Sequence, residues 1–162
     1  MHLLIVRHAI AVDRGTPGIP DAERPLTPEG IERFEQAAAG LARLVDRPDA
    51  LLTSPLLRAR QTAEIAAAAW GRIEPTDTPA LAGGTFADHA KVLDAYAPEA
   101  TVVVVGHEPY VSDLLGRLLG SRDTERLSFR KGGAALVEIR GRLAGGGHLV
   151  WFLPPKVLRK LA

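Results

Sequence analysis

Two short apolar runs place the strongest constraint on how this chain can fold. Residues 3–6 read LLIV and residues 102–105 read VVVV, and neither run contains a polar residue. A strand that is apolar on both of its faces is typical of a parallel sheet with helices covering both sides. We therefore predict that both runs are buried strands of a mostly parallel central sheet.

Segments with helical periodicity follow the predicted strands. Apolar residues recur three and four positions apart between residues 31 and 45 and between residues 57 and 69, which indicates helices with one buried face. Predicted helix starts are marked by a capping residue or a carboxylate followed by proline, at Thr27-Pro28, Ser54-Pro55 and Glu108-Pro109. Strands that alternate with helices predict an α/β protein, in this case a three-layer α/β/α sandwich.

The remaining segments predict shorter strands and loops. Leu51 and Leu52 form another short apolar run, and residues 134–139 and 149–153 have the composition of two strands of a hairpin. Residues 12–24 and 72–85 are rich in proline and other turn-forming residues, which is typical of loops. No internal repeat or change of composition divides the chain, so we predict one domain over residues 1–162.

Composition excludes several kinds of chemistry and partner. The chain has no cysteine, so a cysteine nucleophile, a thiolate metal site and a disulfide framework are all impossible. Its net charge of +1 argues against a protein that coats nucleic acid. Its apolar runs are too short for a signal peptide or a membrane span. We therefore expect a cytoplasmic protein with neither a nucleic-acid nor a membrane partner.

The sequence shows no signature of a metal ion or a cofactor. No two of the five histidines have the spacing of ligands on one helix, and His107-Glu108 lacks the second histidine of a zinc-binding helix. The glycine patterns of nucleotide-binding loops and the serine elbow of hydrolases are also missing from the sequence. We predict that the protein uses no metal and no cofactor.

Charged and imidazole side chains follow the two apolar runs directly. Arg7 and His8 come after the first run, His107 comes after the second, and Arg58 lies near the start of a predicted helix. Because ligands of α/β sheets bind at the carboxyl ends of the strands, we expect these residues to meet there. Two guanidiniums and helix N-termini form a site for an oxyanion such as phosphate, and His8 is our candidate for a covalent nucleophile. Taken singly, each histidine has a simpler interpretation as a turn residue, and Arg58 as a surface ion pair with Glu64.

Four motifs and a late tryptophan, in this order, resemble those of a known family. The motifs are RHAIA (7–11), RPLTPEG (24–30), SPLLRARQTAE (54–64) and VGHEP (105–109), and W-x-x-P follows at 151–154. They resemble the histidine phosphatase superfamily, and the short length with RPLT resembles its SixA-like phosphohistidine phosphatase branch. The resemblance implies a phosphoglycerate mutase-like fold, here without a large inserted cap subdomain because the loops are short.

The same resemblance implies roles for individual residues. His8 is expected to accept the phosphoryl group, while Arg7, Arg58 and His107 bind its oxygens. Arg24 and Glu108 are further candidates for substrate binding. Each of these two also has a simpler interpretation, Arg24 as a brace of its loop and Glu108 as a carboxylate favoured at a helix N-terminus.

The sequence leaves the proton donor unassigned. Relatives that cleave phosphate esters place an acid after a middle strand, where this chain reads PALAGG, or directly after the second histidine, where it has Glu108. Asp13 is a weaker candidate in a loop that could reach the site. A site without an acid favours phosphoramidates, because the imidazole of phosphohistidine leaves more readily than an alkoxide.

The expected function is that of a metal-independent phosphatase with a phosphohistidine intermediate, acting on phosphohistidine in another protein. A phosphatase for a small phosphomonoester is the first alternative, and a phosphate-binding module without catalysis is the second. The expected partner is a phosphorylated protein or a small phosphorylated substrate, and we expect a monomer or a weak dimer.

Overall fold

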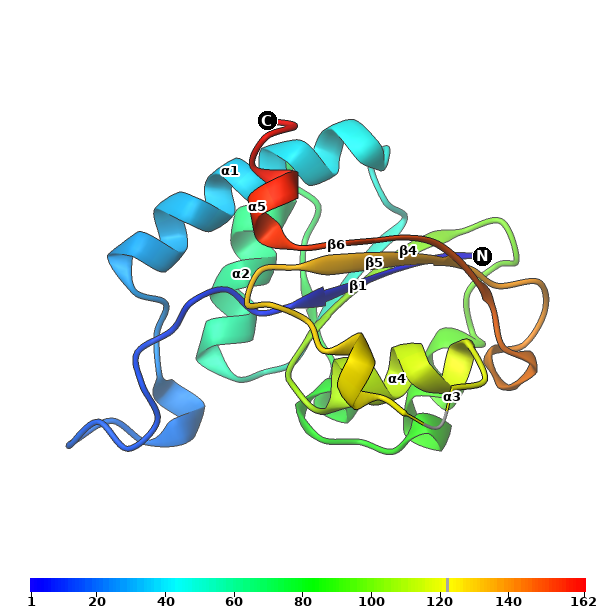
Figure 1. Ribbon diagram of the computed structural model, residues 1–162, viewed down its shortest axis with the longest axis horizontal. Coiled ribbons are helices and arrows are strands. Elements are labelled where there is room, and N and C mark those ends of the chain that lie inside the picture. The colour runs from blue at the N-terminus through cyan, green and yellow to red at the C-terminus, as the bar shows by residue number, and fades with distance from the viewer. Residues whose placement is uncertain (122) are drawn as a thin grey trace.

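The computed structural model describes residues 1–121 and 123–162, which form helices on both sides of one central sheet (Figure 1). The sheet has six strands in the order β3-β2-β4-β1-β5-β6. Their bounds are β1 (His2–Arg7), β2 (Ala50–Thr53), β3 (Thr76–Asp77), β4 (Thr101–Gly106), β5 (Ala134–Glu138) and β6 (His148–Leu153). The first four strands are mutually parallel, and the β5–β6 hairpin joins β1 in antiparallel orientation. The predicted mostly parallel sheet and the late hairpin are confirmed.

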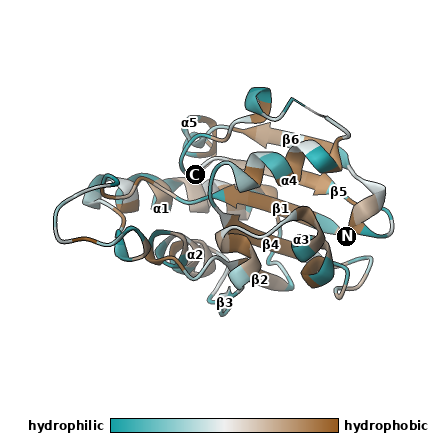
Figure 2. Cartoon of the chain, turned by 90° about the horizontal axis from the view of Figure 1, so that it is seen from below, coloured by the Kyte–Doolittle hydropathy of each residue, from teal (hydrophilic) through white to brown (hydrophobic). Residues whose placement is uncertain are grey.

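Alternate residues of the central strands are buried in two separate cores, one on each face of the sheet. Leu4 and Val6 of β1 contact one core together with residues of α1 (Pro28–Leu44) and α2 (Leu57–Ala69). Leu3 and Ile5 face the opposite core, which includes residues of α3 (Phe86–Leu93) and α4 (Tyr110–Leu118). The short α5 (Pro155–Leu158) packs beside α1. Figure 1 shows the two helix layers on opposite sides of the sheet, and Figure 2 shows that the central strands are hydrophobic, which confirms the three-layer sandwich.

One predicted helix start is confirmed and two need correction. Helix α1 begins at Pro28, and the Oγ1 atom of its N-cap Thr27 accepts a hydrogen bond from the Gly30 N–H at 3.0 Å. Helix α2 begins at Leu57 rather than at Pro55, because the Ser54 N–H still bonds to Val105 O in the sheet at 3.0 Å and the chain turns only afterwards. Helix α4 begins at Tyr110, one residue later than predicted, with Pro109 as its N-cap.

Two short helices were not predicted from the sequence. Helix α3 follows the segment 72–85 that reads as a loop, and it has only eight residues. A capping box at its start, in which Thr85 and Asp88 exchange hydrogen bonds, is the sequence signal that could have revealed it. Helix α5 has four residues, too few for a periodic pattern. Within the described residues, no helix combines the length and the apolar character needed to cross a membrane.

Gly30 allows α1 to pack directly on the backbone that leaves β1. A Cβ atom built at Gly30 would lie 2.0 Å from the carbonyl oxygen of Ile10, two residues after His8. We expect Gly30→Ala to lower the free energy of unfolding by about 3 kcal/mol, because overpacking outweighs the better helix propensity of alanine. Urea denaturation would measure the change. Gly145→Ala is the control, since nothing lies within 4 Å of a Cβ there, and an equal loss in both variants would contradict this account.

Candidate active site

The ends of β1 and β4 bring the two histidines together. These strands are parallel neighbours in which Arg7 pairs with Gly106, so the next residue on each strand leaves the sheet at the same edge. The His8 N–H donates to Gly106 O at 3.0 Å. The centroids of the His8 and His107 rings are 5.0 Å apart with the ring planes tilted by 51°. The predicted meeting of these side chains at the carboxyl ends of the strands is what the structure shows.

Hydrogen bonding determines which nitrogen of His8 is available. Its Nδ1 lies 2.7 Å from the carbonyl oxygen of Ala9, an acceptor only, so Nδ1 carries the proton and donates it. Ala9 is itself held, because its N–H donates to Thr62 Oγ1 at 3.1 Å. The Nε2 atom therefore has a free lone pair. Burial lowers the pKa of His8 to about 3, and the nearby His107, Arg58 and Arg7 add to this effect, so the ring is neutral at pH 7.

His107 is oriented by a side chain from the neighbouring strand end. Its Nε2 lies 2.7 Å from Ser54 Oγ, at the end of β2. When the Ser54 hydroxyl donates to Nε2, the proton of the neutral ring is on Nδ1. Burial lowers the pKa of His107 to about 4, and the Arg58 guanidinium is the next largest cause. In this tautomer His107 is a neutral donor from Nδ1.

Arg7 and Arg58 are each held by hydrogen bonds from the Nη atoms of the guanidinium. Arg7 donates from Nη1 to Phe129 O. Arg58 donates from Nη1 to Asp21 O at 2.7 Å and from Nη2 to the Asp21 carboxylate at 3.3 Å. In both residues Nε is buried and makes no hydrogen bond with the described residues. Each guanidinium therefore keeps one buried N–H donor without a partner among the described residues.

Unpartnered buried polar atoms are concentrated at this site. Among the described residues there are four such side-chain atoms, and three of them are Arg7 Nε, Arg58 Nε and His107 Nδ1. Because buried donors in folded proteins nearly always have a partner, three of them on residues of one site indicate a missing acceptor. Two are cationic N–H groups, and the third is a neutral N–H in the tautomer in which Ser54 donates to His107 Nε2, so the acceptor that fits is an oxyanion with several oxygens, such as phosphate.

The other predicted site residues are held by the protein. Arg24 donates from Nε to Asp21 Oδ1 at 2.9 Å and from Nη1 to Val12 O at 2.6 Å, so it braces its loop. Glu108 accepts from Ser112 Oγ and from the Phe129 N–H, both at 2.7 Å. Contact of Arg24 or Glu108 with substrate stays a prediction. Asp13 is exposed in the loop before Arg24.

Three residues that bond to the candidate site or to its neighbours were missed by the sequence interpretation. Ser54 was assigned only to a helix start, Thr62 only to a buried helix face, and Asp21 not at all. Asp21 lies three residues before Arg24 and contacts Arg58 across 37 positions of sequence. No local pattern encodes such long-range hydrogen bonds.

Within the described part of the chain, no three His, Asp or Glu side chains gather as a metal site would require.

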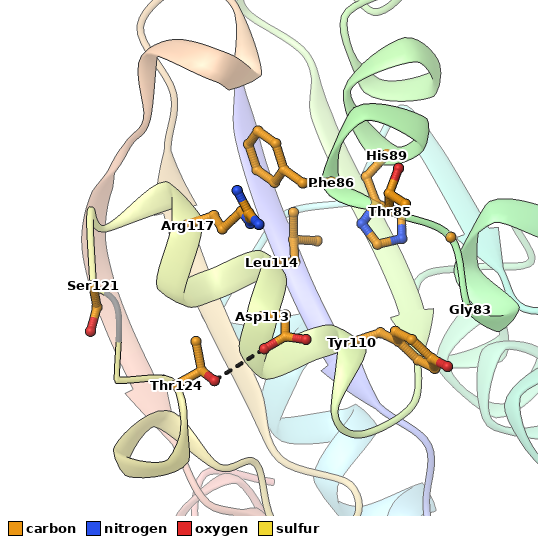
Figure 3. Close-up of a pocket in the computed structure, with 11 residues that line it drawn as sticks. Gly83, Thr85, Phe86, His89, Tyr110, Asp113, Leu114, Arg117, Ser121 and Thr124 are labelled. Carbon is orange, nitrogen blue, oxygen red and sulfur yellow. Dashed lines mark hydrogen bonds between the residues drawn. The ribbon is translucent and has the colours of Figure 1, made fainter.

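A cavity of about 590 Å³ lies between α3 and α4 (Figure 3). Tyr110, the first residue of α4, lies at one end of the row of α4 residues that lines the cavity, and Arg117 lies two turns further along the helix. The Arg117 guanidinium is over the Phe86 ring, 5.8 Å from its centroid. Neither histidine of the site nor Arg7 or Arg58 lines this cavity.

We expect both site histidines to stay neutral between pH 8 and about pH 5. The lowered pKa values of His8 and His107 contrast with about 6.5 in an unfolded chain. Below pH 6.5 the unfolded chain therefore binds more protons, and the two residues lower the free energy of unfolding as the pH falls toward 4. Ring nitrogen chemical shifts measured by NMR would test this, with the same titration in denaturant as the control. A ring that titrates near pH 6 in the folded protein would contradict it.

Comparison with known proteins agrees with this geometry. A model of the histidine phosphatase superfamily (branch 1) matches residues 3–90. An uncharacterised Picosynechococcus protein is 38% identical over 137 residues, 82% of either chain. One from Mycobacterium tuberculosis is 34% identical over 151 residues, 86% of this chain and 94% of its own. The structure of the protein histidine phosphatase SixA complexed with tungstate has a TM-score of 0.82 at 28% identity and covers 98% of this chain and 99% of that one. The predicted phosphoglycerate mutase-like fold is thereby confirmed.

Proposed function

Because this chain belongs to the histidine phosphatase superfamily, we propose that it hydrolyses phosphohistidine in a partner protein, without a metal ion and through a phosphohistidine formed on His8. The similarity to SixA, whose structure holds the tetrahedral oxyanion tungstate, supports an oxyanion site here. The three unpartnered donors support the same interpretation.

The choice of substrate rests on the carboxylates of Glu108 and Asp21, which already have hydrogen-bond or charged partners in the protein. Glu108 accepts two short hydrogen bonds. At Asp21, burial acts to raise the carboxyl pKa, but the hydrogen bond from Arg14 and the charges of Arg58 and Arg24 lower it overall. An ionised Asp21 has no proton to give. The segment after β3 that carries the acid in ester-cleaving relatives has no carboxylate between residues 79 and 84.

A leaving group that needs no acid suits such a site. An alkoxide requires a proton in the transition state, and a positioned acid supplies about 10²–10⁴-fold of rate for it. When the other ring nitrogen of the phosphohistidine carries a proton, the electron pair of the broken P–N bond leaves with a neutral imidazole, and the site has to supply no proton. The described residues of this site therefore fit a phosphoramidate better than an ester.

The mechanism proceeds in two displacements. His8 Nε2 attacks phosphorus in line, the bond from phosphorus to the substrate nitrogen breaks, and Arg7, Arg58 and His107 donate hydrogen bonds to the phosphoryl oxygens. Water then attacks phosphorus, and the bond to His8 Nε2 breaks to release phosphate. The proton of His8 stays on Nδ1 throughout and is donated to the Ala9 carbonyl oxygen, which keeps the ring oriented with Nε2 unprotonated.

The test compares substrates in parallel. Phosphate release is measured from a phosphohistidine protein, p-nitrophenyl phosphate, and sugar and nucleoside phosphates, each with and without excess chelator. We expect the phosphohistidine protein to have the highest kcat/KM and the chelator to have no effect. Faster turnover of a small ester would identify a metabolite phosphatase instead. Phosphate binding without release from any substrate would identify a binding module.

A further inference from the structure

Three arginines converge on the carboxylate of Asp21. Its Oδ1 accepts from Arg24 Nε at 2.9 Å and from Arg14 Nε at 3.1 Å, and its Oδ2 accepts from Arg58 Nη2 at 3.3 Å. Arg14 and Arg24 belong to the same loop as Asp21, the blue segment that extends from the sheet at the lower left of Figure 1. Arg58 belongs to α2. Asp21 therefore connects the loop to a residue of the phosphate site.

The contact between Asp21 and Arg58 determines how the guanidinium is oriented. Arg58 donates from Nη1 to the Asp21 carbonyl and from Nη2 to the Asp21 carboxylate. Two bonds from two nitrogens of a planar group fix its plane as well as its position. The edge that remains is the one that contains Nε, which is buried and unpartnered. The Arg58 side chain is 4% exposed, so it has little room to turn.

The same carboxylate offsets repulsion among the cations. Arg58 and Arg24 are close enough that the charge of Arg24 adds to the effect of burial in lowering the pKa of Arg58, while Asp21 acts in the opposite direction. Without Asp21, no other carboxylate among the described residues forms an ion pair with Arg14, Arg24 or Arg58. The loop would then lose both its connection to α2 and its internal ion pairs.

We propose that Asp21 is a positioning residue that fixes the orientation of the Arg58 guanidinium, so that its unpartnered Nε can donate to the phosphoryl oxygens, and that holds Arg24 in the loop. Asp21 does not itself contact the phosphoryl group. The inference rests on the proposed phosphatase function. It differs from a purely electrostatic view, in which an anion beside a phosphate site only weakens binding of substrate.

The two views predict opposite results for Asp21→Asn. Loss of a negative charge alone should tighten the binding of tungstate and leave kcat unchanged. Loss of positioning should lower kcat about 10- to 100-fold with less than a threefold change in KM, because Arg58 is misaligned in the transition state. Asp21→Glu, which keeps the carboxylate, should recover part of kcat.

Glu23→Gln is the matched control. Glu23 is exposed in the same short turn and forms no ion pair with the described residues. It loses the same charge at nearly the same place, so we expect wild-type kcat and KM. Thermal unfolding of each variant checks that it is folded at the temperature of the kinetic measurement.

A spectroscopic measurement complements the kinetics. In the tungstate complex of the wild type, the Arg58 Nε–H resonance should be resolved and protected from exchange, and Arg58→Lys assigns it. Asp21→Asn should shift and broaden this resonance, and Glu23→Gln should not. The kinetics are measured on whichever substrate the wild type turns over fastest, so the test holds even if that substrate is not phosphohistidine. Unchanged kcat in Asp21→Asn, or a rise in KM alone, would overturn the proposal.

Discussion

Replacing His8 with alanine should abolish phosphate release and leave no phosphate attached to the protein. Among the described residues of the site, the variant loses the only imidazole nitrogen with a free lone pair, because the Nε2 of its neighbour His107 is bonded to Ser54. We expect kcat to fall by at least about 10⁴-fold, which corresponds to about 5.4 kcal/mol of transition-state stabilisation. The measurement is turnover together with labelling by a radioactive phosphoryl donor, with the label identified by the acid lability of phosphohistidine.

His89→Gln is the matched control for this experiment. His89 is a buried histidine outside the site, 4% exposed, and its Nε2 bonds to Ala80 O at 3.0 Å, in the segment that leads to α3. The substitution changes a histidine that is buried to a similar extent as His8, yet labelling should persist. Because the His8 and His107 rings are 5.0 Å apart, the informative failure is a label that moves to His107. Labelling of His8→Ala at wild-type level would refute the assignment of the nucleophile.

The parts of the fold that follow from the sequence are those with a strong local cause. The runs at residues 3–6 and 102–105 contain only residues that favour burial on both faces, and the four valines of the second run leave a strand as the main option. The start of α1 was also predictable, because Thr27 and Pro28 act within one turn. These features need no knowledge of distant residues.

The start of α2 shows where local reasoning fails. Ser54 and Pro55 have the composition of a helix start, but Ser54 continues the sheet through its bond to Val105 O. Its hydroxyl then lies against His107, which is 53 positions away in the sequence. The tertiary hydrogen bond from Ser54 to Val105 has outweighed the local preference for a helix start at Pro55. As a result, the Ser54 hydroxyl is placed where it orients His107.

The site itself was predictable in position but not in detail. Arg7, His8 and His107 follow strand ends, so the parallel sheet alone brings them to one edge. The proton on His8 Nδ1, the orientation of Arg58 and the role of Asp21 depend on hydrogen bonds to Ala9 and across the loop. A sequence lists donors and acceptors, but it does not say which of them meet.

Arg58 provides the second large effect, and we expect Arg58→Ala to lower kcat by about 10³-fold. Loss of one donor to a developing oxyanion costs about 2.7–4 kcal/mol in comparable sites. Here the donor is charged and its side chain is 4% exposed. In addition, Asp21 loses a partner and is left with Arg14 and Arg24. Steady-state kinetics and the dissociation constant of tungstate would separate the loss in the transition state from the loss in binding.

Arg60→Ala is the control that isolates position from charge. Arg60 lies two residues further along α2, where it forms ion pairs with Glu64, Glu74 and Asp77 on the surface. Exposed pairs contribute about 0–1 kcal/mol each to stability, so this variant should unfold slightly earlier and keep its kcat.

Arg58→Lys tests whether charge alone is enough at the phosphate site. A lysine ammonium is a point charge on a flexible stem. It therefore cannot bond to the carbonyl and the carboxylate of Asp21, as Arg58 does, while it presents a second edge to phosphate. We expect it to recover less than about tenfold of the activity that Arg58→Ala loses, which is about 1.4 kcal/mol. Recovery to wild-type kcat would mean that Arg58 acts only through its charge. In that case its bonds to Asp21 would be structural, and the unpartnered Nε would have no part in the chemistry.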